Sequence, residues 1–334
     1  MYRIKRRPKL LLGFSMVAVC LAVYGSSTAT GARVTNKKVA VLFNLPQGPF
    51  SDIYMAGISR IRKAVGRSNV AIAYNLQPSA YQSAMTSYAT RGYGLVILTS
   101  DAFTDAAKLA ASANPHTKFV VINGSAAAGP NLSAYSYRWE QAGLLAGIAA
   151  GLSTRDNKVG AIHGTFNGVK LPPIVRLENG YVQGVRHVNH KATVTTTWIQ
   201  SFTDPTLASD AAQAQLSKGI DTIWVDASSG DPGAYQVAKS NRKIRLIGYG
   251  LPNTLAPKEL ISSLLVNYSK TLEDAFSAYL GGSLKPKVYL QGYASGVFSL
   301  DPRPKNVPAA TRAKIATEVA AAEAGKIRVR TSAG

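Results

Sequence analysis

The chain has 334 residues, enough for about two domains, and its 46% hydrophobic and 16% charged content excludes a disordered protein. A single cysteine excludes an internal disulfide, and the four histidines are scattered, so no zinc site is expected. The net charge of +21 raises nucleic acid or an anionic membrane surface as partners. Because aromatic residues do not interleave with the basic ones, the sequence favours a generally basic surface and no nucleic-acid partner.

The first 32 residues have the layout of a secretory signal peptide. Basic residues between Arg3 and Lys9 precede an apolar run, Leu10 to Tyr24, and small residues follow up to Ala32. We therefore expect an exported protein, periplasmic or at the cell surface, with cleavage after Ala29 or Ala32. Lipidation at Cys20 and an uncleaved membrane anchor remain alternatives, although lipoprotein signals place a small residue where Val19 stands.

From residue 38 onward, short apolar runs alternate with amphipathic stretches. The apolar runs predict strands at 38–44, 70–75, 95–99, 119–123, 134–137, 159–164, 194–200, 222–225, 246–249, 262–266 and 288–292. Between them the spacing predicts helices at 51–65, 80–89, 104–113, 140–152, 174–188, 205–218, 233–240, 269–279 and 309–324. Strands that are apolar throughout and separated by helices indicate parallel sheets covered on both faces, in an α/β, doubly wound architecture with two sheets.

Two helix starts carry capping signals. Asp204 precedes Pro205, which is the arrangement of an N-cap acceptor before a first-turn proline, and Ser51 stands where an N-cap would close the first strand-to-helix turn. Ligands of open α/β sheets bind beyond the carboxyl ends of the strands. The candidate site therefore lies in the turns at 44–52, 100–103, 123–128, 163–173, 201–205, 226–233 and 250–253.

These turns contain no signature of an enzyme or of a cofactor. The first turn lacks both G-x-G-x-x-G and a P-loop, no G-x-S-x-G occurs, and we find no pair of carboxylates suited to acid–base work. His163 ends a strand and is either a polar ligand contact or a satisfied structural histidine. Phe50 and Phe202 each follow a strand, so their rings either sandwich a flat ligand or pack on their own helices.

Residues 37–330 resemble the basic membrane protein family of ABC-transporter substrate-binding proteins, whose best-known members are similar to purine nucleoside receptors. The resemblance is carried by the stretches at 37–42, 92–97, 118–124, 140–147, 158–160, 171–181, 201–205 and 325–329, and Glu140–Gly147 and Ser201–Pro205 are its most specific parts. It implies two Rossmann-like lobes in a periplasmic-binding-protein type I fold with three crossovers. The expected lobes are 37–152 plus about 250–284, and 153–249 plus about 285–330.

The resemblance also implies a ligand site. Its aromatic clamp falls on Phe50 and Phe202, and its polar contacts fall on Gln47, Ser51, Asn123, Ser228, Gly250 and Asn267. Where the family has acids, this chain has Gln47, Asn123 and, at the ribose-gripping position, Gly250, which offers no carboxylate for sugar hydroxyls. We therefore expect a planar, uncharged ligand stacked between Phe50 and Phe202, a nucleobase or related nucleoside-like heterocycle in preference to an intact nucleoside.

The expected function is that of an extracytoplasmic solute-binding protein that feeds an ABC permease, without catalytic activity, metal or cofactor. An extracytoplasmic sensor domain that passes a signal to a membrane partner has the same fold and is the alternative. A DNA-binding regulator would need a helix-turn-helix ahead of residue 37, where the signal-like segment lies. A structural surface protein would bind no ligand.

Overall fold

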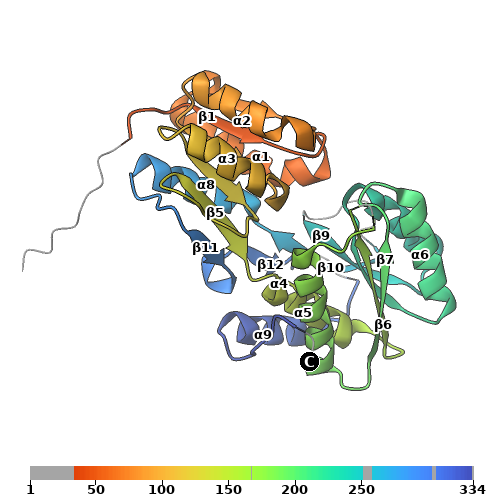
Figure 1. Ribbon diagram of the computed structural model, residues 1–334. Coiled ribbons are helices and arrows are strands. Elements are labelled where there is room, and N and C mark those ends of the chain that lie inside the picture. The colour runs from red at the N-terminus through yellow and green to blue at the C-terminus, as the bar shows by residue number, and fades with distance from the viewer. Residues whose placement is uncertain (1–33, 167, 251–257, 303–305, 333–334) are drawn as a thin grey trace, which may run out of the picture.

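The structure, a computed structural model, describes residues 34–166, 168–250, 258–302 and 306–332. The expected signal peptide and Cys20 lie outside these residues. In the described ranges, no helix combines the length and the apolar character needed to cross a membrane. Two six-stranded sheets form the framework, and their helices cover both faces of each sheet (Figure 1).

The first sheet has the strand order β11-β5-β4-β3-β1-β2, and its paired strands all run parallel. Its strands are β1 (Val39–Leu42), β2 (Val70–Ala73), β3 (Leu95–Leu98), β4 (Lys118–Ile122), β5 (Leu132–Tyr137) and β11 (Val288–Gln291). Alternate residues of β1 and β3 enter two different cores, so both faces are buried. Helices α1 (Pro49–Val65) and α8 (Tyr268–Leu280) cover one face, and α2 (Tyr81–Thr90) and α3 (Thr104–Ala113) cover the other.

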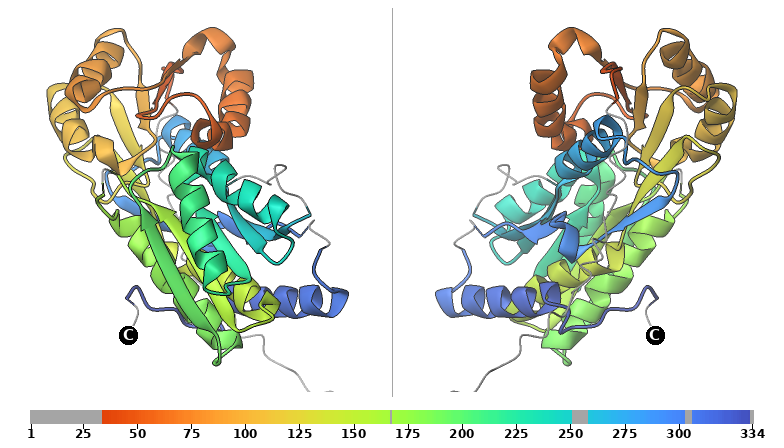
Figure 2. Two further views of the ribbon diagram at one scale, coloured as in Figure 1. Left: turned by 90° about the vertical axis from the view of Figure 1, so that its right-hand side faces the viewer. Right: turned by 90° about the vertical axis from the view of Figure 1, so that its left-hand side faces the viewer.

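The second sheet has the order β12-β10-β9-β8-β6-β7, parallel except for β12 against β10. Its strands are β6 (Lys158–Gly164), β7 (Thr193–Ile199), β8 (Thr222–Asp226), β9 (Arg245–Gly250), β10 (Leu260–Val266) and β12 (Phe298–Leu300). Helices α4 (Trp139–Ser153) and α5 (Pro172–Val188) cover one face, and α6 (Pro205–Ser217) and α7 (Asp231–Ser240) cover the other. Helix α9 (Ala309–Glu323) packs on α4, along the outer edge of this half (Figure 2).

The chain passes between the two sheets three times within the described residues, after β5, after β10 and after β11. These passages differ from the expected lobe boundaries in three places. Helix α4 was expected with the first lobe but packs on α5 and the second sheet. Strand β10 was also expected in the first lobe but pairs with β9 of the second sheet, and β11 was expected in the second lobe but pairs with β5 of the first. The physical reason is that an apolar run predicts a strand without recording which sheet that strand joins.

The strands and helices expected from the apolar pattern are present, with ends that shift by a few residues. The antiparallel strand β12, at Phe298–Leu300, was not expected, because three residues are too short for a clear alternation. Single turns of 3-10 helix lie at Arg67–Asn69, Pro78–Ala80, Asp101–Phe103, Ser228–Gly230 and Tyr293–Ser295.

The two helix starts expected from capping signals have different outcomes. The Asp204 cap is confirmed, since its Oδ1 accepts a 2.8 Å hydrogen bond from the Thr206 N–H. The expectation for Ser51 is wrong: α1 begins earlier, with Gly48 as its N-cap, because Pro49 fits the first helical position. The buried Ser51 hydroxyl instead exchanges hydrogen bonds of 3.0 and 2.9 Å with the Gly48 N–H and carbonyl.

Removing the Asp204 cap should weaken the protein measurably. Asp204→Ala leaves the Thr206 N–H without its acceptor, and the loss of an N-cap typically costs about 1 kcal/mol. Urea unfolding followed by circular dichroism measures the difference. Asp210→Ala, at an exposed position on the same helix, is the control, and an equal loss in both variants would contradict the capping role.

Candidate functional site

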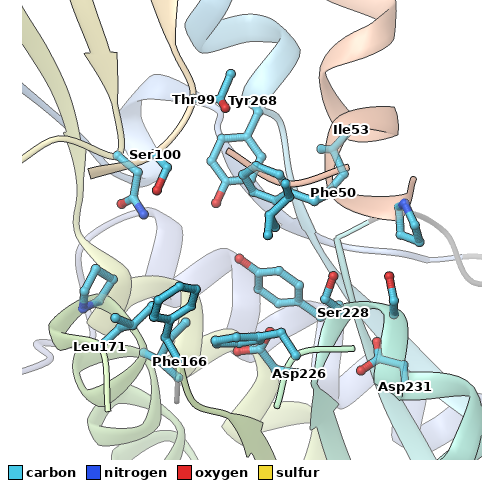
Figure 3. Close-up of a pocket in the computed structure, with 18 of the residues that line it drawn as sticks. Phe50, Ile53, Thr99, Ser100, Phe166, Leu171, Asp226, Ser228, Asp231 and Tyr268 are labelled. Atoms are coloured by element: carbon cyan, nitrogen blue, oxygen red, sulfur yellow. The ribbon is translucent and has the colours of Figure 1, made fainter. Parts of the chain in front are cut away.

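A cavity of about 650 Å³ lies between the two sheets, where the carboxyl ends of their strands meet. Its volume is in the range of small-molecule sites. Figure 3 shows Phe50, Thr99, Ser100 and Tyr268 on the side of the first sheet, and Phe166, Leu171, Asp226 and Asp231 on the side of the second. Most of its lining belongs to the strand-to-helix turns that the sequence singles out.

The wall on the side of the first sheet is aromatic. Phe50, the second residue of α1, lies with its ring centroid 5.5 Å from that of Tyr54 and 6.1 Å from that of Tyr268. The Tyr54 and Tyr268 rings stack on each other at 4.9 Å, and the Phe43 ring meets Phe50 edge-on at 6.5 Å. These edge and stacked contacts fix the position of Phe50, which is half-buried at the cavity.

The opposite wall contains two phenylalanines. The Phe202 ring lies against Gly164, where any Cβ would overlap it, and the Phe202 carbonyl accepts a 3.2 Å hydrogen bond from the Gly230 N–H. Phe166 follows β6 and keeps 52% of its surface exposed. Its backbone pairs with that of Val169 through hydrogen bonds of 3.1 and 3.0 Å. Both Phe50 and Phe202 thus line one cavity from opposite sheets.

Two of the expected polar residues line this cavity, Asn123 and Ser228. Asn123 has a left-handed backbone, with φ of 60°, and its Oδ1 accepts a 2.9 Å hydrogen bond from the Trp139 indole N–H. This bond fixes the orientation of the Asn123 amide at the cavity. Ser228 also has a positive φ, 51°, and begins the 3-10 turn after β8.

Four expected site residues, all in the described part of the chain, do not line the cavity. Gln47 is exposed in the turn before α1, and Ser51 is occupied by its bonds to Gly48. Gly250 ends β9 with φ of 88°, beside the Ile53 side chain. Asn267 caps α8, where its Oδ1 accepts a 3.0 Å hydrogen bond from the Lys270 N–H. The resemblance places these four residues at the site, but none of them lies on the cavity lining of this structure.

His163 is a structural histidine and not a ligand contact. Its side chain is fully buried, with Nε2 2.8 Å from Glu178 Oε2 and Nδ1 3.4 Å from Asp226 Oδ2. Burial lowers the pKa of His163, but the two flanking carboxylates raise it to about 9. The Trp198 and Trp224 rings each lie 5.1 Å from the imidazole. A protonated imidazole therefore sits behind the cavity wall, between two buried acids.

Asp226 and Asp231 are the buried acids of the cavity wall on the side of the second sheet. Burial raises the pKa of Asp231 well above its usual range, and the nearby Asp226 charge adds to this effect. The Asp231 carboxyl also accepts hydrogen bonds from the Ala227 N–H, at 2.6 Å, and from the Tyr235 hydroxyl, at 3.3 Å. Asp226 is only 3% exposed, and its Oδ2 makes the 3.4 Å ion-pair contact with His163 Nδ1 but no hydrogen bond.

Sequence reasoning did not single out several lining residues. Phe166 and Asp226 lie in the candidate turns at 163–173 and 226–233, but nothing in the sequence distinguishes them from neighbouring apolar or polar residues. Trp139 and Tyr268 open helices directly after passages between the sheets, so only the topology brings them to the cavity. In the described residues, no group of His, Cys, Asp and Glu has the arrangement of a metal site.

Comparison with known proteins agrees with this architecture. Residues 40–329 match the family model described as ABC transporter substrate-binding protein PnrA-like. The chain belongs to this family of substrate-binding proteins. The PnrA-like proteins bind solutes and do not catalyse reactions, so the expectation of a binding protein and not an enzyme is confirmed.

Individual relatives support the same assignment. The chain is 26% identical to the Borrelia garinii basic membrane protein A2, over 81% of each chain, and 26% identical to a purine-binding protein of Brucella abortus, over 85% and 81%. It is 29% identical to a nucleoside-binding protein of Lactococcus lactis, over 48% of this chain and 45% of that one. A solute-binding protein from Aeropyrum pernix K1 superposes with a TM-score of 0.73 at 19% identity, covering 89% of this chain and 94% of the other. The expected type I binding-protein fold is thereby confirmed.

Proposed function

We propose that this member of the PnrA-like family is the extracytoplasmic solute-binding protein of an ABC importer, and that it holds a planar heterocycle, a nucleobase or nucleoside-like compound. The observation that carries the proposal is the pair Phe50 and Phe202, which line one cavity of about 650 Å³ from opposite sheets. Flat rings bind between aromatic faces by offset stacking, which tolerates different substituents at the ring edge. The names of the Lactococcus and Brucella relatives, nucleoside-binding and purine-binding, support the same ligand class.

The polar groups at the cavity favour a base over an intact nucleoside. Asn44, Asn123, Ser100 and Ser228 offer neutral donors and acceptors for a ring edge. The position of the family's ribose-gripping acid is Gly250, which has no side chain to accept from sugar hydroxyls. A buried hydroxyl without a partner costs about 1–3 kcal/mol, so a ribosyl group placed beside Gly250 gains little from that position.

The two-sheet construction supports a role in transport. The walls of the cavity come from separate sheets joined by three chain passages, so closure of the two halves would bury the ligand. Ligand that contacts both walls would shift the open–closed equilibrium toward the closed form, which the membrane permease would then recognise. In this proposal the signal-like segment at residues 1–32 directs export.

Truncating either phenylalanine should weaken heterocycle binding. Stacking of a base on an aromatic ring is worth about 1–3 kcal/mol, so Phe50→Ala and Phe202→Ala should each lower affinity by about 5-fold to 150-fold. Isothermal titration calorimetry against adenine, hypoxanthine and their nucleosides measures this. Tyr88→Ala, in α2 and away from the cavity lining, is the control. The proposal would be contradicted if both phenylalanine variants bound these heterocycles with wild-type affinity, or if the wild type bound only sugars or amino acids.

A further inference from the structure

The cavity has a charge opposite to that of the chain. Of the described residues that line it, Asp52, Asp226 and Asp231 are acidic and none is lysine, arginine or histidine. The whole chain has a net charge of +21, so its basic residues are kept away from this cavity. A bound anion would meet acidic side chains and no basic side chain on the cavity lining, which is unfavourable in a partly desolvated site.

Asp226 is the carboxylate that remains for a ligand. Asp231 is occupied, because the Ala227 N–H and the Tyr235 hydroxyl both donate to it and burial favours its neutral form. Asp52 is exposed on the first turn of α1. Asp226 lines the cavity and is only 3% exposed, and its Oδ2 faces the His163 imidazole at 3.4 Å without making a hydrogen bond. A buried acceptor of this kind gains most from a donor brought by the ligand.

The groups behind Asp226 keep the wall negative. The imidazole of His163 is flanked by two carboxylates, Asp226 on the cavity side and Glu178 on the other. One positive charge between two negative ones leaves a net negative charge. Glu178 also accepts a hydrogen bond from the Thr196 hydroxyl and does not line the cavity. The arrangement fixes Asp226 in place while leaving it able to attract a donor.

Aromatic faces complete the chemistry of the site. Phe50, Phe166, Phe202, Trp139 and Tyr268 all line the cavity, and Figure 3 shows Phe50 and Tyr268 on the wall opposite Phe166 and Asp226. The face of an aromatic ring carries partial negative charge and attracts cations as well as flat neutral rings. Aromatic faces and an acid without basic residues suit a ligand with positive charge or N–H donors.

We infer that the cavity selects a planar heterocycle that is positively charged or amino-substituted, that Asp226 accepts a hydrogen bond from its N–H group, and that anionic analogues are excluded. The inference rests on the proposed function and narrows its ligand class. It departs from the sequence-based expectation of an uncharged ligand, because that expectation did not include Asp226.

Matched ligands and variants test the role of Asp226. Calorimetry would compare the binding of four ligands. Hypoxanthine replaces the amino group of adenine by a carbonyl, adenosine monophosphate is the anionic analogue, and 1-methylnicotinamide is the cationic probe. The wild type should bind adenine and 1-methylnicotinamide at least about 10-fold more tightly than hypoxanthine, and the monophosphate not measurably. Asp226→Asn should remove the preference for adenine over hypoxanthine and weaken binding of the cationic probe.

Glu178→Gln is the matched control. It perturbs the same buried triad from the side away from the cavity, so a purely structural effect would appear in both variants, whereas loss of ligand selectivity should appear only in Asp226→Asn. Unchanged selectivity in Asp226→Asn, equal loss in both variants, or tight binding of the monophosphate would overturn the inference and leave the proposed function standing. Failure of the wild type to bind any of these heterocycles would overturn both.

Discussion

Gly147→Ala is expected to destabilise the protein by about 3 kcal/mol or more. Helices α4 and α5 approach so closely that a Cβ at Gly147 would overlap the Tyr181 carbonyl and lie 2.9 Å from the Val185 nitrogen. These obstacles are backbone atoms in a helix, which cannot turn aside as a side chain can. Overpacking of a core typically costs 1–3 kcal/mol, and a clash with rigid backbone lies at or above the upper end.

The contact is built by glycines on both helices. Gly143 and Gly147 of α4 meet α5, and Gly180 and Gly184 of α5 meet α4, with every added Cβ within 3.0 Å of partner backbone or overlapping it. A shift of one helix to relieve position 147 would therefore tighten another contact. The pair also covers the second sheet behind the cavity wall, so the effect should extend to the whole of that half.

Chemical unfolding of the purified variants measures the effect, with soluble expression as the first readout. Gly281→Ala is the control, since Gly281 has an ordinary φ of −77° at the end of α8 and a Cβ there would lie 3.3 Å from its nearest neighbour. A loss at Gly147 no larger than that at Gly281 would contradict the close-packing argument.

Replacement of His163 should give the second large effect. In His163→Gln the carboxylates of Glu178 and Asp226 stay buried without the cation between them, and removing one partner of a buried ion pair typically costs about 3–5 kcal/mol. The Trp198 and Trp224 rings enclose the site, so water cannot readily replace the lost charge. Urea unfolding at pH 7 measures the loss, and Thr193→Ala, at an exposed end of β7, is the control.

The same group predicts the pH dependence of stability. The pKa of His163 is raised from 6.5 to about 9 in the folded protein, so the imidazolium contributes fully below pH 6.5 and its contribution is lost as the pH rises through about 9. The difference in unfolding free energy between wild type and His163→Gln should therefore shrink between pH 6.5 and 10. A constant difference over this range would contradict a protonated His163. Direct NMR titration of the His163 ring in the wild type gives the answer even when the variant does not fold.

Local patterns predicted the elements well because the central strands of a parallel sheet are buried on both faces. Runs such as Val39–Leu42 and Leu95–Leu98 are apolar throughout, which a surface strand would not be. The capping signal at Asp204 was equally local and is confirmed. At Ser51 two local signals competed, and Pro49 set the start of the helix.

The site was only partly predictable, because its geometry depends on which elements become neighbours. Phe50 and Phe202 lie in turns that follow strands, and such turns line the ligand site of an open α/β sheet, so their place at the cavity could be predicted. The His163 triad joins β6, α5 and β8, and the pairing of these three elements leaves no mark in any one stretch of sequence. Gly250 and Asn267 were placed by resemblance, but the backbone at the end of β9 and the cap of α8 direct them away from the cavity lining.

The last two strands of the chain, β11 and β12, affect how the protein folds. Strand β11 covers the edge of β5 in the first sheet, and β12 covers the edge of β10 in the second, although both lie after residue 287. Synthesis proceeds from the N-terminus, so a growing chain exposes two unpaired strand edges until nearly all of it is available. The pairing of Ala134 with Val288 spans nearly half of the sequence, and contacts between residues so far apart in the chain slow folding. A fragment ending before β11 would lack both closing strands, so neither half of the molecule is a contiguous folding unit.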